Sequence, residues 1–251
     1  MTRYYCSGFD INNAFGHGLG DMFLSELKDT KSIVYIPGSP EKIQKAREKY
    51  VPAFTEHFKN VGIQFDSSII ITPEMNNDEA QKVVKEASFI MLMGGDPFKQ
   101  KEMCEKLGLL EELKKYDGLM LGFSAGAMLM SKHIIITPCS EEYPEFHIEE
   151  GLNLDGISIY PHNNTNQEEY PNTLVVGDET YQKEDLLKVA NEYGEYYLLQ
   201  DYLREDGLTD VSIIKSTNGS LEFYIENDGR VWLVKSGEIN LTNSTSKVIK
   251  K

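Results

Sequence analysis

The chain has 251 residues, which is enough for one α/β domain with a substantial buried core. Apolar residues make up 40% of it, a globular composition that excludes disorder along the whole length. The formal net charge of −15 argues against nucleic acid or an anionic membrane surface as a partner, because phosphate binding needs a concentrated basic face.

Short apolar runs alternate with helical patterns through the first half of the chain. The runs that predict strands are 3–8, 32–37, 67–72, 88–94 and 118–123. The amphipathic stretches that predict helices lie near 41–61, 78–87 and 98–115, and Pro52 predicts a kink or two shorter helices in the first of them. This alternation predicts an α/β fold with a mostly parallel sheet flanked by helices on both faces.

The second half of the chain is richer in strand patterns. They fall at 133–138, 156–161, 195–200, 211–216, 220–226 and 231–235, with one helix near 180–193. Turn signals at Asn218-Gly219 and Asp228-Gly229 separate the last three strands and predict an antiparallel extension at the sheet edge. We therefore expect one domain over residues 1–237 and a polar tail over 238–251.

The cysteine content indicates a reducing compartment. Cys6, Cys104 and Cys139 are few, odd in number and widely spaced, so no disulfide framework is expected. The first ten residues lack the apolar stretch of a signal peptide, and no apolar run approaches the length of a membrane span. We expect a cytoplasmic protein.

The strongest local signal is the G-x-S-x-G pattern centred on Ser124. It follows the apolar strand that ends at Phe123 and precedes a helical run, which is the context of a nucleophile elbow. Gly122 and Gly126 would allow the tight bend, and the helix N-terminus would place free amides beside a developing oxyanion. A plain strand–helix turn with glycines for steric reasons is the other interpretation.

A second signal is the loop Gly94-Gly95-Asp96 at the end of the preceding strand. In a parallel sheet this loop lies beside the Ser124 turn, so the amides of Gly95 and Ala125 are the candidate oxyanion donors. Asp96 followed by proline is also a good helix cap, so a simple capped helix explains the same residues.

A nucleophilic serine needs a neighbouring base, and the chain offers five histidines. His162 ends an apolar strand, which can bring it level with Ser124, and it is the favoured base; His147 is a distant second. The other three lie in a glycine-rich N-terminal loop (His17), on a helix edge (His57) and at the far end of the helix after Ser124 (His133). His162 follows Ser124 by only 38 positions, too few for the usual α/β-hydrolase sheet.

These motifs together resemble peptidase family S51, which includes peptidase E and cyanophycinase. The resemblance covers most of the chain and rests on the strand end at 36–39, Gly94-Gly95, the elbow, Tyr160-Pro161-His162 and the closing strand 231–238. It implies a fold like that of class I glutamine amidotransferases, with serine in place of cysteine at the elbow. It also implies Ser124 as nucleophile, His162 as base, and Gly95 and Ala125 as oxyanion donors.

The sequence departs from the family pattern at two places. Asp96 stands where the family usually has Asn, and 163–182 lacks the basic residue by which peptidase E holds an acidic substrate side chain; Lys183 is the only nearby substitute. A site lined by Asp96, Glu168 and Glu169 would favour a free amine or a basic substrate, and we take this as a hypothesis.

A catalytic histidine also needs an acid that orients its ring, and the sequence offers several. The candidates are Glu141, Glu142, Asp201 and Asp210. We favour Asp201, because the end of a strand positions a side chain rigidly.

The function predicted from these residues is hydrolysis of a small peptide or related amide through an acyl-enzyme on Ser124, by a dipeptidase or an isopeptidase. The alternative is a catalytically silent small-molecule-binding protein of the same fold. No metal or cofactor motif is present, so neither is expected. The sequence leaves a homo-oligomer open.

Overall fold

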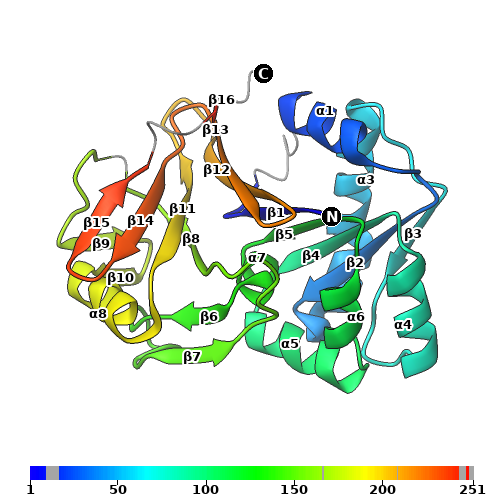
Figure 1. Cartoon of the computed structure of the whole chain (residues 1–251), viewed down its shortest axis with the longest axis horizontal. Coiled ribbons are helices and arrows are strands. Elements are labelled where there is room, and N and C mark those ends of the chain that lie inside the picture. Colours follow the sequence, from blue (N-terminus) through cyan, green and yellow to red (C-terminus); the bar gives the residue numbers. More distant parts are fainter. Residues whose placement is uncertain (10–16, 166, 208, 243–246, 249–251) are drawn as a thin grey trace.

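The computed structural model describes residues 1–9, 17–165, 167–207, 209–242 and 247–248 (Figure 1). Its main feature is a twisted sheet to which twelve of the described strands belong. Along the sheet the order is β3 (Ser67–Ile70), β2 (Ser32–Gly38), β4 (Phe89–Gly95), β5 (Leu119–Phe123), β1 (Thr2–Cys6), β12 (Thr209–Thr217), β11 (Tyr196–Leu203), β14 (Val231–Lys235) and β15 (Glu238–Leu241). Three further strands branch from this path: β8 (Ile159–Asn163) on β11, β13 (Ser220–Glu226) on β12, and β16 (Lys247–Val248) on β13.

Strand direction changes in the middle of the sheet. The five strands from β3 to β1 are parallel, whereas β1 pairs β12, and β12 pairs β11 and β13, in antiparallel fashion. The parallel strand β8 then joins β11. A mostly parallel core flanked by helices, with antiparallel C-terminal strands, confirms the predicted fold class.

Helices cover both faces of the parallel half. The helical segments are α1 (His17–Glu26), the 3₁₀ turn η1 (Pro40–Lys42), α2 (Ile43–Lys45), the π-helical turn η2 (Ala46–Tyr50), α3 (Val51–Asn60), α4 (Asn77–Glu86), α5 (Pro97–Lys106), α6 (Leu110–Lys115), α7 (Ala125–Met130) and α8 (Lys183–Tyr193). Two small sheets, β6 (His133–Ile136) with β7 (His147–Glu150) and β9 (Thr173–Val176) with β10 (Glu179–Gln182), complete the described elements.

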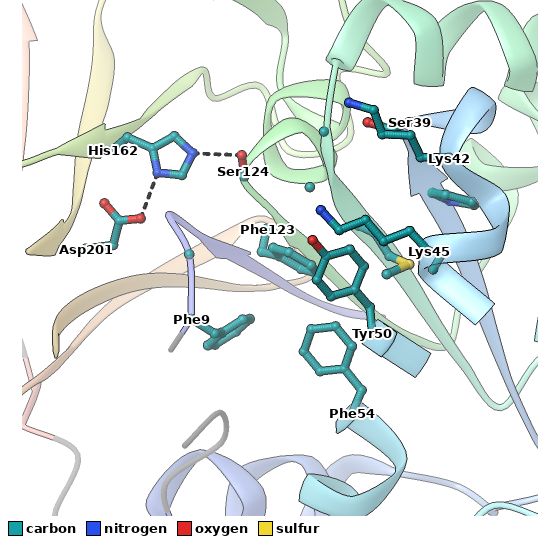
Figure 2. A pocket seen from close by; sticks show the side chains of 16 residues that line it. Phe9, Ser39, Lys42, Lys45, Tyr50, Phe54, Phe123, Ser124, His162 and Asp201 are labelled. Atoms are coloured by element: carbon teal, nitrogen blue, oxygen red, sulfur yellow. Dashed lines mark hydrogen bonds and ion pairs between the residues drawn. The ribbon is translucent and has the colours of Figure 1, made fainter. Parts of the chain in front are cut away.

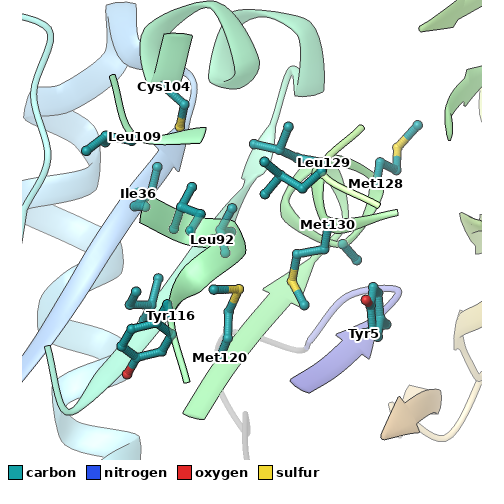
Figure 3. Close-up of a cluster of buried hydrophobic side chains, with 14 of the residues drawn as sticks. Tyr5, Ile36, Leu92, Cys104, Leu109, Tyr116, Met120, Met128, Leu129 and Met130 are labelled. Carbon is teal, nitrogen blue, oxygen red and sulfur yellow. The ribbon is translucent and has the colours of Figure 1, made fainter. Parts of the chain in front are cut away.

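The side chains of β4 point alternately to the two faces of the sheet, which explains why its sequence is apolar throughout. Ile90 and Leu92 face the cluster formed with α4 to α7, part of which Figure 3 shows, whereas Phe89 and Met91 face the cluster formed with α1 and α3. Both sides of the strand are therefore buried, as a parallel sheet between two helical layers requires. A third cluster, which includes the buried Trp232, packs α8 against β11 and β14.

Several described segments differ from the sequence-based prediction, among them α1, the strands β7, β9 and β10, and the first residues of the expected tail. The glycine-rich segment after residue 16 forms α1, whose Leu19 and Phe23 are buried and whose Gly20 leaves no room for a Cβ beside Val61. Burial of two side chains thus outweighs the low helix propensity of glycine. The first residues of the expected tail form β15, because Ile239 and Leu241 pack against the third cluster.

The interruption expected at Pro52 lies just before it. Residues 46–50 form the π-helical turn, and α3, with Pro52 as its second residue, follows that turn directly. Among the described residues, no helix is both long enough and apolar enough to cross a membrane.

Candidate active site

Ser124 lies at the sharp turn between β5 and α7. Its backbone has φ 51° and ψ −120°, a conformation that a non-glycine residue rarely adopts, and its N–H donates to the carbonyl of Cys6 at 3.1 Å. A Cβ on Gly126 would lie 2.1 Å from the carbonyl oxygen of Leu92, and one on Gly122 would lie 2.7 Å from the backbone of Gly126. The two glycines of the motif are therefore sterically required.

His162 faces Ser124 from the end of β8. Its Nε2 lies 2.8 Å from Ser124 Oγ. Like Ser124, it has a positive φ, of 61°. Its backbone N–H donates to Ser7 Oγ at 2.6 Å, and the buried Ser7 hydroxyl donates to the carbonyl of Leu199 at 2.9 Å. Ser7, directly after β1, thus links the end of β8 to the middle of β11 and holds His162 in its unusual conformation.

Asp201 completes a chain of three side chains (Figure 2). Its Oδ2 accepts a hydrogen bond from His162 Nδ1 at 2.7 Å, and its side chain is 15% exposed. A proton on Nδ1 leaves the lone pair of Nε2 directed at the Ser124 hydroxyl, which is the arrangement of a general base. Gly8 packs on this carboxylate so closely that a Cβ there would lie 2.5 Å from Oδ2.

The other candidate acids lie elsewhere. Asp210 accepts from the backbone N–H of Asp228 and lies 3.7 Å from Arg204, while Glu141 and Glu142 are exposed. The strand-end argument therefore selected the carboxylate that contacts His162.

The pKa of His162 is raised above its ordinary value of 6.5. Partial desolvation of the ring lowers the pKa, but the hydrogen bond that His162 donates to Asp201 and the negative charges of Asp201 and Glu179 raise it by more. The imidazolium that forms when His162 takes a proton is therefore stabilised by these carboxylates.

The two candidate oxyanion donors flank the elbow. The Ala125 amide is in the first turn of α7, where no earlier carbonyl of the helix can accept from it. Gly94 lies against Ser124, since a Cβ on Gly94 would come within 3.3 Å of Ser124 Cβ. Gly95 has φ 139° and packs on Gly38. Their role as donors stays a prediction.

Several residues considered from the sequence lie away from Ser124. Asp96 caps α5, where it accepts from the amides of Phe98 and Lys99. His147 contacts Glu149 and the ring of Phe98. The cavity beside Ser124, described below, is also not lined by His57 on α3, His133 on β6, Glu168, Glu169 or Lys183. The side chain of His17 lies outside the described part of the chain.

A cavity of about 420 Å³ opens beside the triad. Ser124, His162 and Asp201 form one end of it. The remaining lining includes the side chains of Phe9, Ser39, Lys42, Lys45, Tyr50, Phe54, Met93 and Phe123.

Sequence reasoning missed the contribution of the segment that follows β2. Its helical periodicity predicts a buried stripe, and Ala46 and Phe54 are indeed buried in the cluster formed with α1 and α3. Sequence reasoning did not show that these two residues and Tyr50 also line the cavity, next to Lys42 and Lys45. The available signal was topological: the segment begins at the carboxyl end of β2, the neighbour of β4, and ligands of open α/β sheets bind at that edge.

Comparison with known proteins gave one family and several structures. The model of peptidase family S51 matches residues 11–193. A peptidase from an acI-B1 actinobacterium has a similar structure, with a TM-score of 0.62 and 17% identity over 96% of this chain and 93% of that chain. A peptidase E candidate from Listeria monocytogenes EGD-e gives a TM-score of 0.50 and 16% identity over 96% and 97%. No curated protein sequence matches closely enough to count as a relative.

Proposed function

This chain belongs to peptidase family S51, and from that premise we propose that it is a serine hydrolase that cleaves a small peptide or related amide through an acyl-enzyme on Ser124. The observation that carries the proposal is the hydrogen-bonded chain from Ser124 Oγ through His162 to Asp201, with separations of 2.8 and 2.7 Å. Such a chain on a strained strand–helix turn is the arrangement of an activated serine.

In the first half of the reaction, Ser124 Oγ attacks the scissile carbonyl carbon while His162 Nε2 takes the hydroxyl proton. The carbonyl oxygen becomes an oxyanion, for which the amides of Ala125 and Gly95 are the proposed donors. Asp201 stabilises the imidazolium without taking its proton.

In the second half, the tetrahedral intermediate collapses. The C–N bond breaks, His162 passes its proton to the departing amine, and the acyl group stays on Ser124 as an ester. A water molecule then attacks the ester, with His162 again acting as base, and releases the acid and the free serine.

The size of the cavity supports a small substrate. A volume of about 420 Å³ falls within the range of small-ligand sites. Dipeptides, with either an ordinary or a side-chain isopeptide linkage, are the compounds that we propose to test first.

The test is hydrolysis of a panel of α-linked and isopeptide-linked dipeptides, followed by release of free amino acids. Ser124→Ala and His162→Ala should each lower kcat by about 10⁴- to 10⁶-fold, because the two residues act as a unit. Ser25→Ala, at an exposed serine of α1, and His147→Ala should retain wild-type rates. Equal turnover by Ser124→Ala and wild type would refute the proposal, and a folded wild type that binds but cleaves no peptide would favour a binding protein.

A further inference from the structure

The cavity extends from Ser124 in the direction away from His162. Figure 2 shows His162 and Asp201 on one side of Ser124, and Lys42, Lys45 and Tyr50 on the other. In the proposed mechanism His162 must deliver a proton to the departing amine, so the leaving group lies on the histidine side. The acyl group of the substrate therefore lies on the opposite side, which we call the lysine side.

The floor of the lysine side is aromatic. The ring centroid of Phe123 lies 5.6 Å from that of Phe54 and 5.6 Å from that of Phe9. Tyr50 and Met93 extend this apolar surface. Such a floor favours an acyl group with an apolar body, because contact with it removes apolar area from water.

The rim of the lysine side is positive. Lys42 and Lys45 are exposed, and Lys45 Nζ lies 5.4 Å above the ring centroid of Tyr50. Among the described residues, no carboxylate oxygen lies within the 4.0 Å of an ion pair to Lys45 Nζ. Lys42 has only a distant contact, 3.9 Å, to its neighbour Glu41, which Lys99 shares at the same distance.

No acidic residue of the described lining opposes these two cations. The only carboxylate among the lining residues is Asp201, and it is hydrogen-bonded to His162. The acidic side chains from which a preference for basic substrates was expected, Asp96, Glu168 and Glu169, are not part of the lining. A positive rim on a chain of net charge −15 is a local reversal of the overall field.

We propose that the lysine side binds an acyl group with an apolar body and a distal carboxylate, and that Lys45, assisted by Lys42, contacts that carboxylate. A carboxylate is the anion that peptide substrates carry. The inference rests on the proposed function for its orientation, since the mechanism decides which side receives the acyl group. It assigns selectivity to residues after β2, in place of the basic residue that is missing after His162.

The test compares three substrates that differ only at the far end of one ring. They are the 4-nitroanilides of 4-carboxyphenylalanine, phenylalanine and 4-(aminomethyl)phenylalanine, with kcat/KM as the readout. We expect the kcat/KM of the carboxylate to exceed that of the neutral compound by about fivefold, the upper limit for an exposed ion pair, and the amine to be the poorest substrate.

The chain offers a matched control for the lysine. Lys49 also lies over the Tyr50 ring, at 5.8 Å, and is exposed, but it does not line the cavity. Lys45→Met should remove most of the preference for the carboxylate, whereas Lys49→Met, which removes the same charge from the adjoining turn η2, should keep it. Equal preference in both variants, or no preference in wild type, would overturn the inference.

A binding experiment separates failure of the inference from failure of the proposed function. Calorimetric titration of the Ser124→Ala protein with the three corresponding amides needs no turnover. A tighter Kd for the carboxylate compound, lost in Ser124→Ala/Lys45→Met and kept in Ser124→Ala/Lys49→Met, would support the subsite even if no anilide is cleaved. Identical affinities for all three amides would contradict it even if wild type proves to be an active hydrolase.

Discussion

The two sides of Ser124 differ in how their polar groups are satisfied. On the hydrogen-bonded side, Ser124, His162 and Asp201 contact each other at 2.7 to 2.8 Å. The hydroxyl of Ser7 accepts from the His162 amide, and Gly8 packs on the Asp201 carboxylate. On the lysine side, Lys42 and Lys45 contact no side chain of the lining that could neutralise them.

This difference matches two tasks, catalysis on the hydrogen-bonded side and substrate recognition on the lysine side. A reaction needs groups that are already oriented, because their reorganisation would add to the barrier. Recognition of a charged substrate group needs a partner that is free until the substrate arrives. Substitutions on the hydrogen-bonded side should therefore change kcat for every substrate, whereas substitutions on the lysine side should change the ranking of substrates.

After removal of Ser124 or His162 themselves, the substitution expected to lower kcat most is Asp201→Asn. An asparagine amide can donate to Nδ1 and so stabilise the tautomer with a proton on Nε2, which cannot accept the serine proton. We expect kcat to fall by about 10³- to 10⁴-fold for all substrates, with little change in their ranking.

The same variant has a signature in pH. Only neutral His162 can act as base, so activity falls as the pH drops through the pKa of His162. The acid limb of the wild-type pH–rate profile should lie above pH 6.5, because Asp201 and Glu179 raise that pKa. Asp201→Asn removes the largest raising cause, so the limb should move to lower pH. Asp210→Asn, at the rival carboxylate, should leave it in place; a limb that moves with Asp210 instead would contradict the assignment.

A smaller effect is expected from Gly8→Ala. The added Cβ would lie 2.5 Å from Asp201 Oδ2, so the carboxylate must move away from His162. A displacement of this size should lower kcat by about 10²-fold while the thermal midpoint changes little.

Gly219→Ala is the control for Gly8→Ala, because it should lower stability and leave kcat unchanged. This glycine has φ 83° in the β12–β13 turn, with open space around it. We expect a loss of about 1 kcal/mol or more in the free energy of unfolding and an unchanged kcat. A kcat equal to wild type in Gly8→Ala would show that the packing on Asp201 is not needed for activity.

The smallest effect on this side is expected from Ser7→Ala. Loss of the hydroxyl leaves the His162 amide and the Leu199 carbonyl without their partner, which should cost about 1–3 kcal/mol of unfolding free energy. Because Ser7 positions His162 and does not touch the substrate, kcat should fall by roughly tenfold with KM unchanged. Urea unfolding and steady-state kinetics measure the two effects, and a rise in KM alone would argue against a positioning role.

The hydrogen-bonded side was largely predictable from the sequence. The elbow is a local pattern, since strand, glycines, serine and helix follow one another within the same stretch, and the ends of β8 and β11 pointed to His162 and Asp201. The positive φ of His162 and its contact with Ser7 were not predictable, because they join β1, β8 and β11, which are far apart in the chain.

The lysine side was not predicted, for a physical reason. The spacing of Ala46, Tyr50 and Phe54 predicts a buried helix face, and lysines beside such a face are usually solvated. Only the tertiary structure turns that face into the wall of a cavity next to Ser124. Helix α1 was missed for a related reason, since its stability comes from burial of Leu19 and Phe23 and not from helix propensity.

The most direct test of an activated serine is labelling with a fluorophosphonate probe, read by intact mass, with wild type beside Ser124→Ala and His162→Ala. The account predicts one adduct on wild type, none on Ser124→Ala, and much slower labelling of His162→Ala. Labelling that persists in Ser124→Ala, or a folded wild type that takes up no probe, would contradict the central claim that His162 and Asp201 activate Ser124 as a nucleophile.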